Sequence, residues 1–150
     1  MVFTDREEVM HRFLGLVLAL LAATFLAQAQ GLARAEEPAD SIQAVIVSQL
    51  DAFQANDLTA AFAHASPTIQ SKFGTPEVFG RAVETGYPVI WRPARHEMLA
   101  LIETATGRIQ LVLFEDRAGR LFEAVYDMRQ IDGVWRINGV YLRALLAAGI

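Results

Sequence analysis

The 150-residue sequence contains no cysteine. This absence excludes disulfides, thiolate catalysis, covalent haem attachment, iron–sulfur clusters and cysteine-based zinc sites. A domain without disulfides depends on its hydrophobic core for stability. Charge is also scarce: charged residues make up 20% of the chain, and the formal net charge is −4. We therefore expect no nucleic-acid partner, because phosphate binding needs a dense basic face.

The one long hydrophobic run lies near the N-terminus. Residues 13–27 carry no charge and are followed by two small-x-small motifs, which end at Ala29 and Ala35. This is the pattern of a secretory signal peptide. We predict a signal peptide over residues 1–35, cleaved after Ala35 or after Ala29, and hence a periplasmic or secreted protein with no membrane association after cleavage.

The start of this segment leaves two alternatives open. Asp5, Glu7 and Glu8 make the first ten residues acidic, where a signal peptide is normally basic. Initiation at Met10 instead of Met1 would give a conventional signal peptide, and we keep both starts as hypotheses. The alternative to cleavage is a retained membrane anchor, but a span needs about 20 apolar residues and this run is shorter.

Helical periodicity begins after this segment. Asp40–Gln43 resembles a capping box, and apolar residues at helical spacing predict a helix from Ile42 to about Asn56. Asp57 is expected to cap a second helix.

Proline and glycine mark the later boundaries of the helical part. Ser66-Pro67 and Thr75-Pro76 each combine a cap with a first-turn proline, and the second pair opens a third helix. Gly74 and Gly86 are expected to end the helices. The connector 87–93 contains two prolines and is predicted to be extended.

From residue 96 onward the hydrophobic period changes to two, which indicates strands. The predicted strands are His96–Glu103, Arg108–Glu115, Leu121–Gln130 and Val134–Arg143. Short turns at Gly107, Gly119 and Gly133 make them an antiparallel meander. Three helices followed by four strands predict an α+β fold in which the helices cover one face of the sheet.

The second predicted strand is apolar on both faces. Ile109 to Phe114 reads IQLVLF, whereas a sheet with one wet face should alternate. A curved sheet or the apolar tail from Leu145 could cover the second face. A homodimer formed through the sheet face is the other explanation.

Several stretches of the chain occur together in one exported bacterial family. They are Ile42 to Asp57, Ala65-Ser66-Pro67-Thr68-Ile69-Gln70 with Phe73-Gly74, Gly86 to Pro93, and Asp132 to Val140. On these stretches the chain resembles the family catalogued as domain of unknown function 4864. The order of helices and then a bent meander also resembles the nuclear transport factor 2-like (cystatin-like) superfamily.

The resemblance implies a fold and export. It implies a cone of three helices on a curved four-stranded meander over residues 42–145. A polar mature N-terminus, 36–41, precedes this domain and an apolar tail, 146–150, follows it. The close family carries no assigned activity. The superfamily includes isomerases, dehydratases, epoxide hydrolases, ligand-binding domains and scaffolding partners, so the fold alone decides no function.

Catalytic and metal-binding patterns are lacking. In such a cone the helical residues pointing inward would be Phe53, Phe62, Phe79 and Val83, none of which can transfer a proton. His64 and His96 have no second ligand at metal-binding spacing. We therefore predict no catalytic residue, no metal and no cofactor, and lean against an enzyme.

The candidate ligand-binding residues are aromatic or basic. Tyr87, Trp91 and Arg92 lie on the proline-rich connector, where aromatic surface and a guanidinium group could hold an anionic, partly apolar ligand. Tyr126 is expected to face the interior. Trp135 is expected to share one face of the last strand with Ile137 and Tyr141, as core or as the lining of a pocket.

Three functions remain open. The first is noncatalytic binding of a small apolar or anionic ligand or of a protein partner. The second is an isomerase- or dehydratase-type enzyme, and the third is a dimeric assembly domain without a pocket. A cavity with a buried acid or histidine would favour the enzyme. An apolar cavity without one would favour binding, and a filled interior beneath an apolar sheet face would favour assembly.

Overall fold

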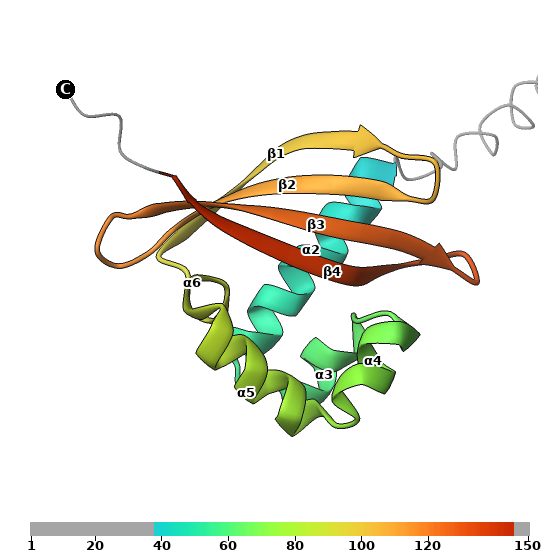
Figure 1. Cartoon of the computed structure of the whole chain (residues 1–150), viewed down its shortest axis with the longest axis horizontal. Coiled ribbons are helices and arrows are strands. Elements are labelled where there is room, and N and C mark those ends of the chain that lie inside the picture. Colours follow the sequence, from blue (N-terminus) through green and yellow to red (C-terminus); the bar gives the residue numbers. More distant parts are fainter. Residues whose placement is uncertain (1–37, 146–150) are drawn as a thin grey trace, which may run out of the picture. The chain divides into compact units, whose positions relative to one another are not determined.

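The structure, a computed structural model, describes residues 38–145 and contains helices followed by one sheet (Figure 1). The helices are α2 (Pro38–Gln54), α3 (Leu58–Ala63), α4 (Pro67–Phe73), α5 (Pro76–Gly86) and α6 (Pro88–Trp91). The strands are β1 (Arg95–Glu103), β2 (Arg108–Glu115), β3 (Leu121–Ile131) and β4 (Val134–Leu145). The predicted α+β class is confirmed.

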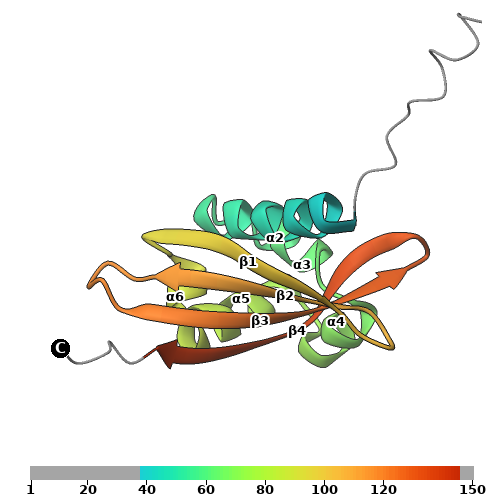
Figure 2. The ribbon, with the colours of Figure 1, turned by 90° about the horizontal axis from the view of Figure 1, so that it is seen from above.

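The four strands form one antiparallel sheet in the order β1-β2-β3-β4, as the short turns predicted. Each begins and ends within two residues of its predicted bounds. At the turns, Gly119 and Gly133 have positive φ (75° and 79°), a conformation that glycine adopts without strain. All the described helices lie on one face of the sheet, and the strands twist strongly across it (Figures 1 and 2).

Three of the four predicted helix caps are present. Asp57, Ser66 and Thr75 each accept a hydrogen bond from the backbone N–H three residues further on, at 2.9, 3.3 and 3.3 Å. Gly74 follows α4 with φ 75°. These side chains satisfy amide groups that the first helical turn leaves without partners.

The helix count of three is corrected to five within residues 38–145. Ser66-Pro67 begins a separate helix, so the second predicted helix is divided into α3 and α4. The first helix starts at Pro38 instead of Ile42, which places Asp40 inside its first turn instead of at a cap. Proline suits this first position, because it lacks the amide hydrogen that has no partner there.

The connector 87–93 was predicted to be extended, and this is wrong for its centre. Pro88–Trp91 forms the short helix α6, with Pro88 in its first turn. Only the flanking residues are non-helical: Tyr87 has φ −136° and Arg92 has φ −145°. Each of them precedes a proline, and a proline disfavours the helical conformation in the residue before it.

The core lies between α2 and the inner face of the sheet. Ile42, Ile46 and Leu50 on α2 are buried, as are Val112 and Phe114 on β2. Their spacing along α2 is the predicted apolar stripe.

Both edge strands carry a β-bulge. The register shifts between Met98 and Leu101 on β1, and opposite Asp127 and Met128 on β4. A bulge reverses the alternation of side chains beyond it. Tyr141 was expected to share a face with Trp135, but it lies beyond the β4 bulge and is 72% exposed.

Three predictions fall outside the described residues. They are the signal peptide over residues 1–35, with the choice between Met1 and Met10, the beginning of the polar segment 36–41, and the tail 146–150. Within residues 38–145, no helix is long and apolar enough to span a membrane.

Candidate functional site

A cavity of about 370 Å³ lies between α2, the helices α4, α5 and α6, and β4. Its wall is mainly apolar. The helical residues lining it are Gln49, Phe53, Thr68, Ile69, Lys72, Phe73, Phe79, Ala82, Val83 and Ile90. Ala65, Tyr87 and residues 137–141 complete the lining. This volume is within the range of small-molecule sites, about 300–1,000 Å³.

Phenylalanine rings form the deep wall of this cavity. The Phe79 ring lies 5.9 Å from Phe53, 5.3 Å from Phe62 and 5.5 Å from Phe73, measured between ring centroids. Tilted and edge-on contacts at these distances stabilise aromatic clusters. Of the four residues expected to point inward, Phe53, Phe79 and Val83 line the cavity, whereas Phe62 packs behind Phe79.

Few polar groups face the cavity. Gln49 is 3% exposed, and its Nε2 donates to the Ala61 carbonyl oxygen at 3.1 Å. Lys72 is exposed, with its Nζ 5.5 Å from the centre of the Phe73 ring. No aspartate, glutamate or histidine occurs among the described lining residues. The described lining therefore offers mainly apolar contact, together with one cation.

Of the predicted connector residues, only Tyr87 lines the cavity. The Tyr87 hydroxyl lies 3.5 Å from the Val140 carbonyl oxygen. Trp91 packs on Phe53 instead, with 5.2 Å between ring centroids. Arg92 stacks on Trp91 at 4.8 Å.

Arg92 is already occupied by contacts within the protein. It donates to the carbonyl oxygens of Phe53 and Trp91 and to Asn56 Oδ1, the last at 2.7 Å. These bonds tie the end of α2, through Phe53 and Asn56, to the end of α6, through Trp91. The geometry favours a structural role for Arg92.

The two strand residues predicted to bind ligand are also separated. Tyr126 is fully buried on the inner face, and burial raises the pKa of its hydroxyl. That hydroxyl has no hydrogen-bond partner among the described residues. Trp135 lines a different, open hollow beside the start of α2, together with Arg108 and Gln130.

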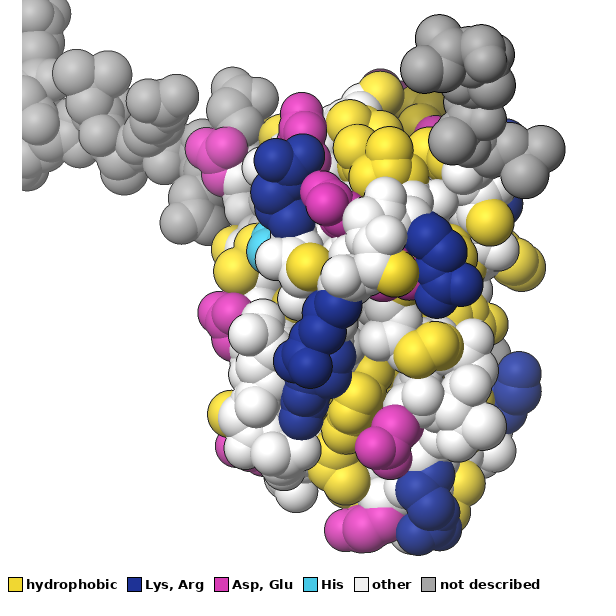
Figure 3. Space-filling view, turned by 90° about the vertical axis from the view of Figure 1, so that its left-hand side faces the viewer, with side chains coloured by type: hydrophobic (Ala, Val, Ile, Leu, Met, Phe, Trp, Pro, Cys, Tyr) yellow, Lys and Arg dark blue, Asp and Glu magenta, His cyan; other side chains and the backbone are white. Residues whose placement is uncertain are grey.

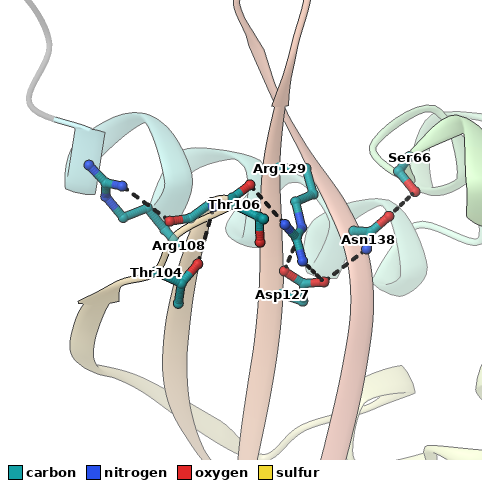
Figure 4. A network of polar contacts seen from close by, with 8 residues as sticks. Ser66, Thr104, Thr106, Arg108, Asp127, Arg129 and Asn138 are labelled. Atoms are coloured by element: carbon teal, nitrogen blue, oxygen red, sulfur yellow. Dashed lines mark hydrogen bonds and ion pairs between the residues drawn. The ribbon is translucent and has the colours of Figure 1, made fainter.

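A polar network joins α4 to the edge of the sheet (Figure 4). Ser66 Oγ donates to Asn138 Oδ1 at 2.9 Å, and Asn138 Nδ2 donates to Asp127 Oδ2 at 2.8 Å. Arg129 Nη2 donates to the same Asp127 oxygen at 3.1 Å, and its Nη1 donates to the Thr106 carbonyl oxygen at 2.8 Å. Arg129 Nε lies 2.9 Å from Asp127 Oδ1 as an ion pair, although not in line for a hydrogen bond.

This network holds the cavity wall in place. Ser66 is fully buried and donates to an amide oxygen, which is not a base, so it is unsuited to act as a nucleophile. Backbone bonds add to the attachment: Ser66 N–H donates to Ile137 O, and Ile137 N–H donates to His64 O. Asn138 is part of the β4 bulge and lines the cavity.

Of the described residues, neither His64 nor His96 belongs to a cluster of metal-binding side chains. His64 lies beside Arg136, and burial followed by that positive charge lowers the pKa of its imidazole. His96 packs beside Phe114, with 6.1 Å between ring centroids. No cluster of three or more metal-binding side chains exists within residues 38–145.

A second hollow lies between α6 and the β2–β3 turn. Arg92, Arg117 and Arg120 surround it, and Phe122 and Leu142 contribute apolar surface. Figure 3 faces this end of the domain and shows basic side chains beside apolar ones. Arg120 pairs with Asp116 at 2.7 Å, which reduces the positive charge open to a ligand.

Sequence reasoning missed Gln49 and Lys72 as lining residues. Gln49 is a polar residue in a buried helix position, which no pattern distinguishes from a surface residue. Lys72 did carry a signal, because it is the only lysine in the chain.

Comparison with known proteins places the chain in a family. No curated protein matches it. Residues 35–149 match a family model described as "Domain of unknown function (DUF4864)", which covers the whole described domain. The chain therefore belongs to this family of domains of unknown function.

Proposed function

We propose that the domain binds a small, largely apolar molecule in the cavity between α2, α4, α5, α6 and β4, without catalysis. The observation that carries this proposal is the cavity itself, about 370 Å³ with walls of phenylalanine and aliphatic side chains. Burial of apolar ligand surface contributes about 25 cal/mol per Å² before the costs of association.

The composition of the wall favours binding over the enzymatic alternative. An isomerase or dehydratase needs a positioned acid or base within hydrogen-bond reach of the substrate. Among the described lining residues, the side chains that could exchange a proton are those of Lys72 and Tyr87, besides the weakly acidic hydroxyl of Thr68. Tyr141 borders the cavity, but its side chain belongs to the outer face of the sheet. The Tyr87 hydroxyl is directed at a backbone carbonyl.

A cavity-filling variant tests the proposal. The full-length chain should enhance the fluorescence of the neutral probe N-phenylnaphthylamine saturably, and Ala82→Phe should abolish this, because the new ring occupies the cavity. Ala55→Phe, at an exposed position after α2, is the matched control and should bind like the parent. Absence of saturable binding, or equal binding by Ala82→Phe, would contradict the proposal. If the probe binds as expected, native mass spectrometry of gently purified protein would identify the natural ligand.

Self-association through the sheet is a second candidate function, and a separate observation supports it. The outer face carries exposed Leu99, Ile102 and Tyr141 beside half-buried Leu111 and Val125. A contiguous apolar surface of this kind is typical of an interface.

A charged substitution tests the dimer. If the sheet face is the interface, sedimentation equilibrium should report a dimer for the parent chain and a monomer for Leu111→Glu. Val78→Glu places the same charge on α5, at an exposed apolar residue away from the sheet, and should remain dimeric. A monomeric parent would exclude this second function.

Export and the wider superfamily belong to the same proposal. The order of helices before a bulged meander supports a nuclear transport factor 2-like cone, and the apolar run before Ala35 supports a signal peptide. Intact-mass measurement of protein recovered from the periplasm or medium should give a chain starting at Glu36 or Gln30. A retained N-terminal segment would contradict cleavage.

A further inference from the structure

Lys72 is unusual in both number and position. It is the only lysine among 150 residues, and it is the only lysine or arginine among the described residues that line the cavity. The five ion pairs described within residues 38–145 all use arginine, so none engages the Lys72 ammonium group. An unpaired cation thus lies at the exposed margin of a largely apolar site.

We propose that the cavity selects monocarboxylates with an apolar body, whose carboxylate pairs with Lys72. This inference rests on the proposed binding function and specifies its ligand class. A carboxylate placed among the Phe53 and Phe79 rings would lose its hydration without gaining a counter-charge, which is costly. The favourable orientation therefore puts the charged end at Lys72 and the apolar end against the rings.

The charge balance of the site distinguishes a carboxylate from a phosphate. A phosphate monoester approaches two negative charges at neutral pH, and it is best held by several donors or by the fork of an arginine. Lys72 supplies one positive charge, and no arginine is among the described lining residues. A singly charged head group matches this site.

The cavity volume indicates the size of the ligand. One water occupies about 30 Å³ of the liquid. A cavity of about 370 Å³ therefore has room for at least about a dozen non-hydrogen atoms. Decanoate is of this size and carries the expected charge, and decanol is its neutral counterpart.

Calorimetric titration of the full-length chain with decanoate and decanol tests the inference. Lys72→Met should weaken decanoate binding about five-fold, the upper end for an exposed ion pair, and leave decanol binding unchanged. Lys72→Arg should retain the preference for decanoate, because it retains the charge. Arg117→Met removes an exposed cation from the β2–β3 turn and is the matched control.

The single lysine also permits a direct localisation of the head group. Reductive dimethylation labels only Lys72 and the N-terminal amine, and the charge is kept. Decanoate should shift the dimethyl-Lys72 NMR signal, and decanol should shift it much less.

The possible results separate the two proposals. Equal binding of decanoate and decanol by the parent chain and by Lys72→Met would overturn the carboxylate inference and leave the binding function standing. If neither compound binds and the neutral fluorescent probe is not bound either, the binding function fails and the inference fails with it. If the neutral probe binds in the cavity but decanoate does not, only the inference is overturned.

Discussion

The two faces of the sheet differ in burial more than in composition. On the inner face, Val112, Phe114 and Tyr126 are fully buried beneath the helices. Leu111 and Leu113 alternate with Val112 and Phe114 along β2 and belong to the outer face. They remain partly exposed, because no described helix covers that side (Figure 1). Hydrophobicity alone therefore does not tell which face of β2 is core.

The same hydrophobic residue types therefore stabilise the folded monomer on the inner face and remain available for association on the outer face. Inner-face side chains stabilise the folded monomer through burial and close packing. Outer-face side chains contribute little more until a second surface covers them. Substitutions on the two faces should therefore respond differently to protein concentration.

The largest expected effect comes from the inner face. Phe114→Ala should lower the free energy of unfolding by about 3–5 kcal/mol, because it leaves a cavity in a fully buried layer. Denaturant unfolding followed by circular dichroism measures the loss. A loss below about 1 kcal/mol would show that the inner layer can collapse around the deletion.

Leu113→Ala, one residue earlier on the outer face, is the matched comparison. In dilute protein it should cost less than about 1.5 kcal/mol, because the side chain is only half buried. A larger cost that grows with protein concentration would indicate that a second copy covers this face.

The next effect concerns the edge of the sheet, where the polar network joins β4 to the start of α4. Ser66→Ala removes both the cap of α4 and the donor to Asn138, and should cost about 2 kcal/mol. Thr75→Ala removes only an exposed cap of the same kind and should cost about 1 kcal/mol or less. The two free energies of unfolding are compared under identical conditions.

The Asn138→Ala and Ser66→Ala double mutant separates the network from the cap. If the two side chains interact as the structure places them, their effects should be non-additive by at least about 0.5 kcal/mol. Additive losses of unfolding free energy would show that the Ser66 and Asn138 side chains contribute independently.

The local structure could be predicted well where short-range chemistry decides it. Proline, glycine and capping residues located the helix boundaries at Ser66 and Thr75, and strand-type hydrophobic runs between turn glycines located the four strands. These signals act over three or four residues, so the sequence alone carries them. The family was also identified from the residues, and the family match agrees with it.

Features that depend on distant neighbours could not be predicted. The β4 bulge lies where Asn138 forms hydrogen bonds with Asp127 and Ser66, which belong to other parts of the fold. Beyond the bulge, Tyr141 lies on the opposite face from the one predicted. The cavity likewise requires several separate elements to meet. This explains why Tyr87 was the only one of the five predicted ligand-binding residues placed in its wall.

The smallest effect concerns one oxygen atom on the inner face. The Tyr126 hydroxyl is buried without a described partner, so Tyr126→Phe should be neutral or should stabilise the protein by about 1 kcal/mol at pH 7. Destabilisation by more than about 1 kcal/mol would indicate a bound internal water, which the neighbouring unpaired Gln110 Oε1 could also hold. Tyr141→Phe, on the exposed face, should change stability by close to zero.

The same hydroxyl predicts a pH dependence of defined sign. Burial raises the pKa of Tyr126 above its ordinary value of 10. Above pH 10 the unfolded chain releases this proton while the folded chain retains it, so the unfolded state binds fewer protons and stability falls as pH rises. The parent should therefore lose about 1.4 kcal/mol per pH unit relative to Tyr126→Phe above that pH, with no such difference below it. Parallel curves for the two proteins between pH 9 and pH 11 would mean that the hydroxyl reaches solvent, and that the inner face is less tightly closed than its packing indicates.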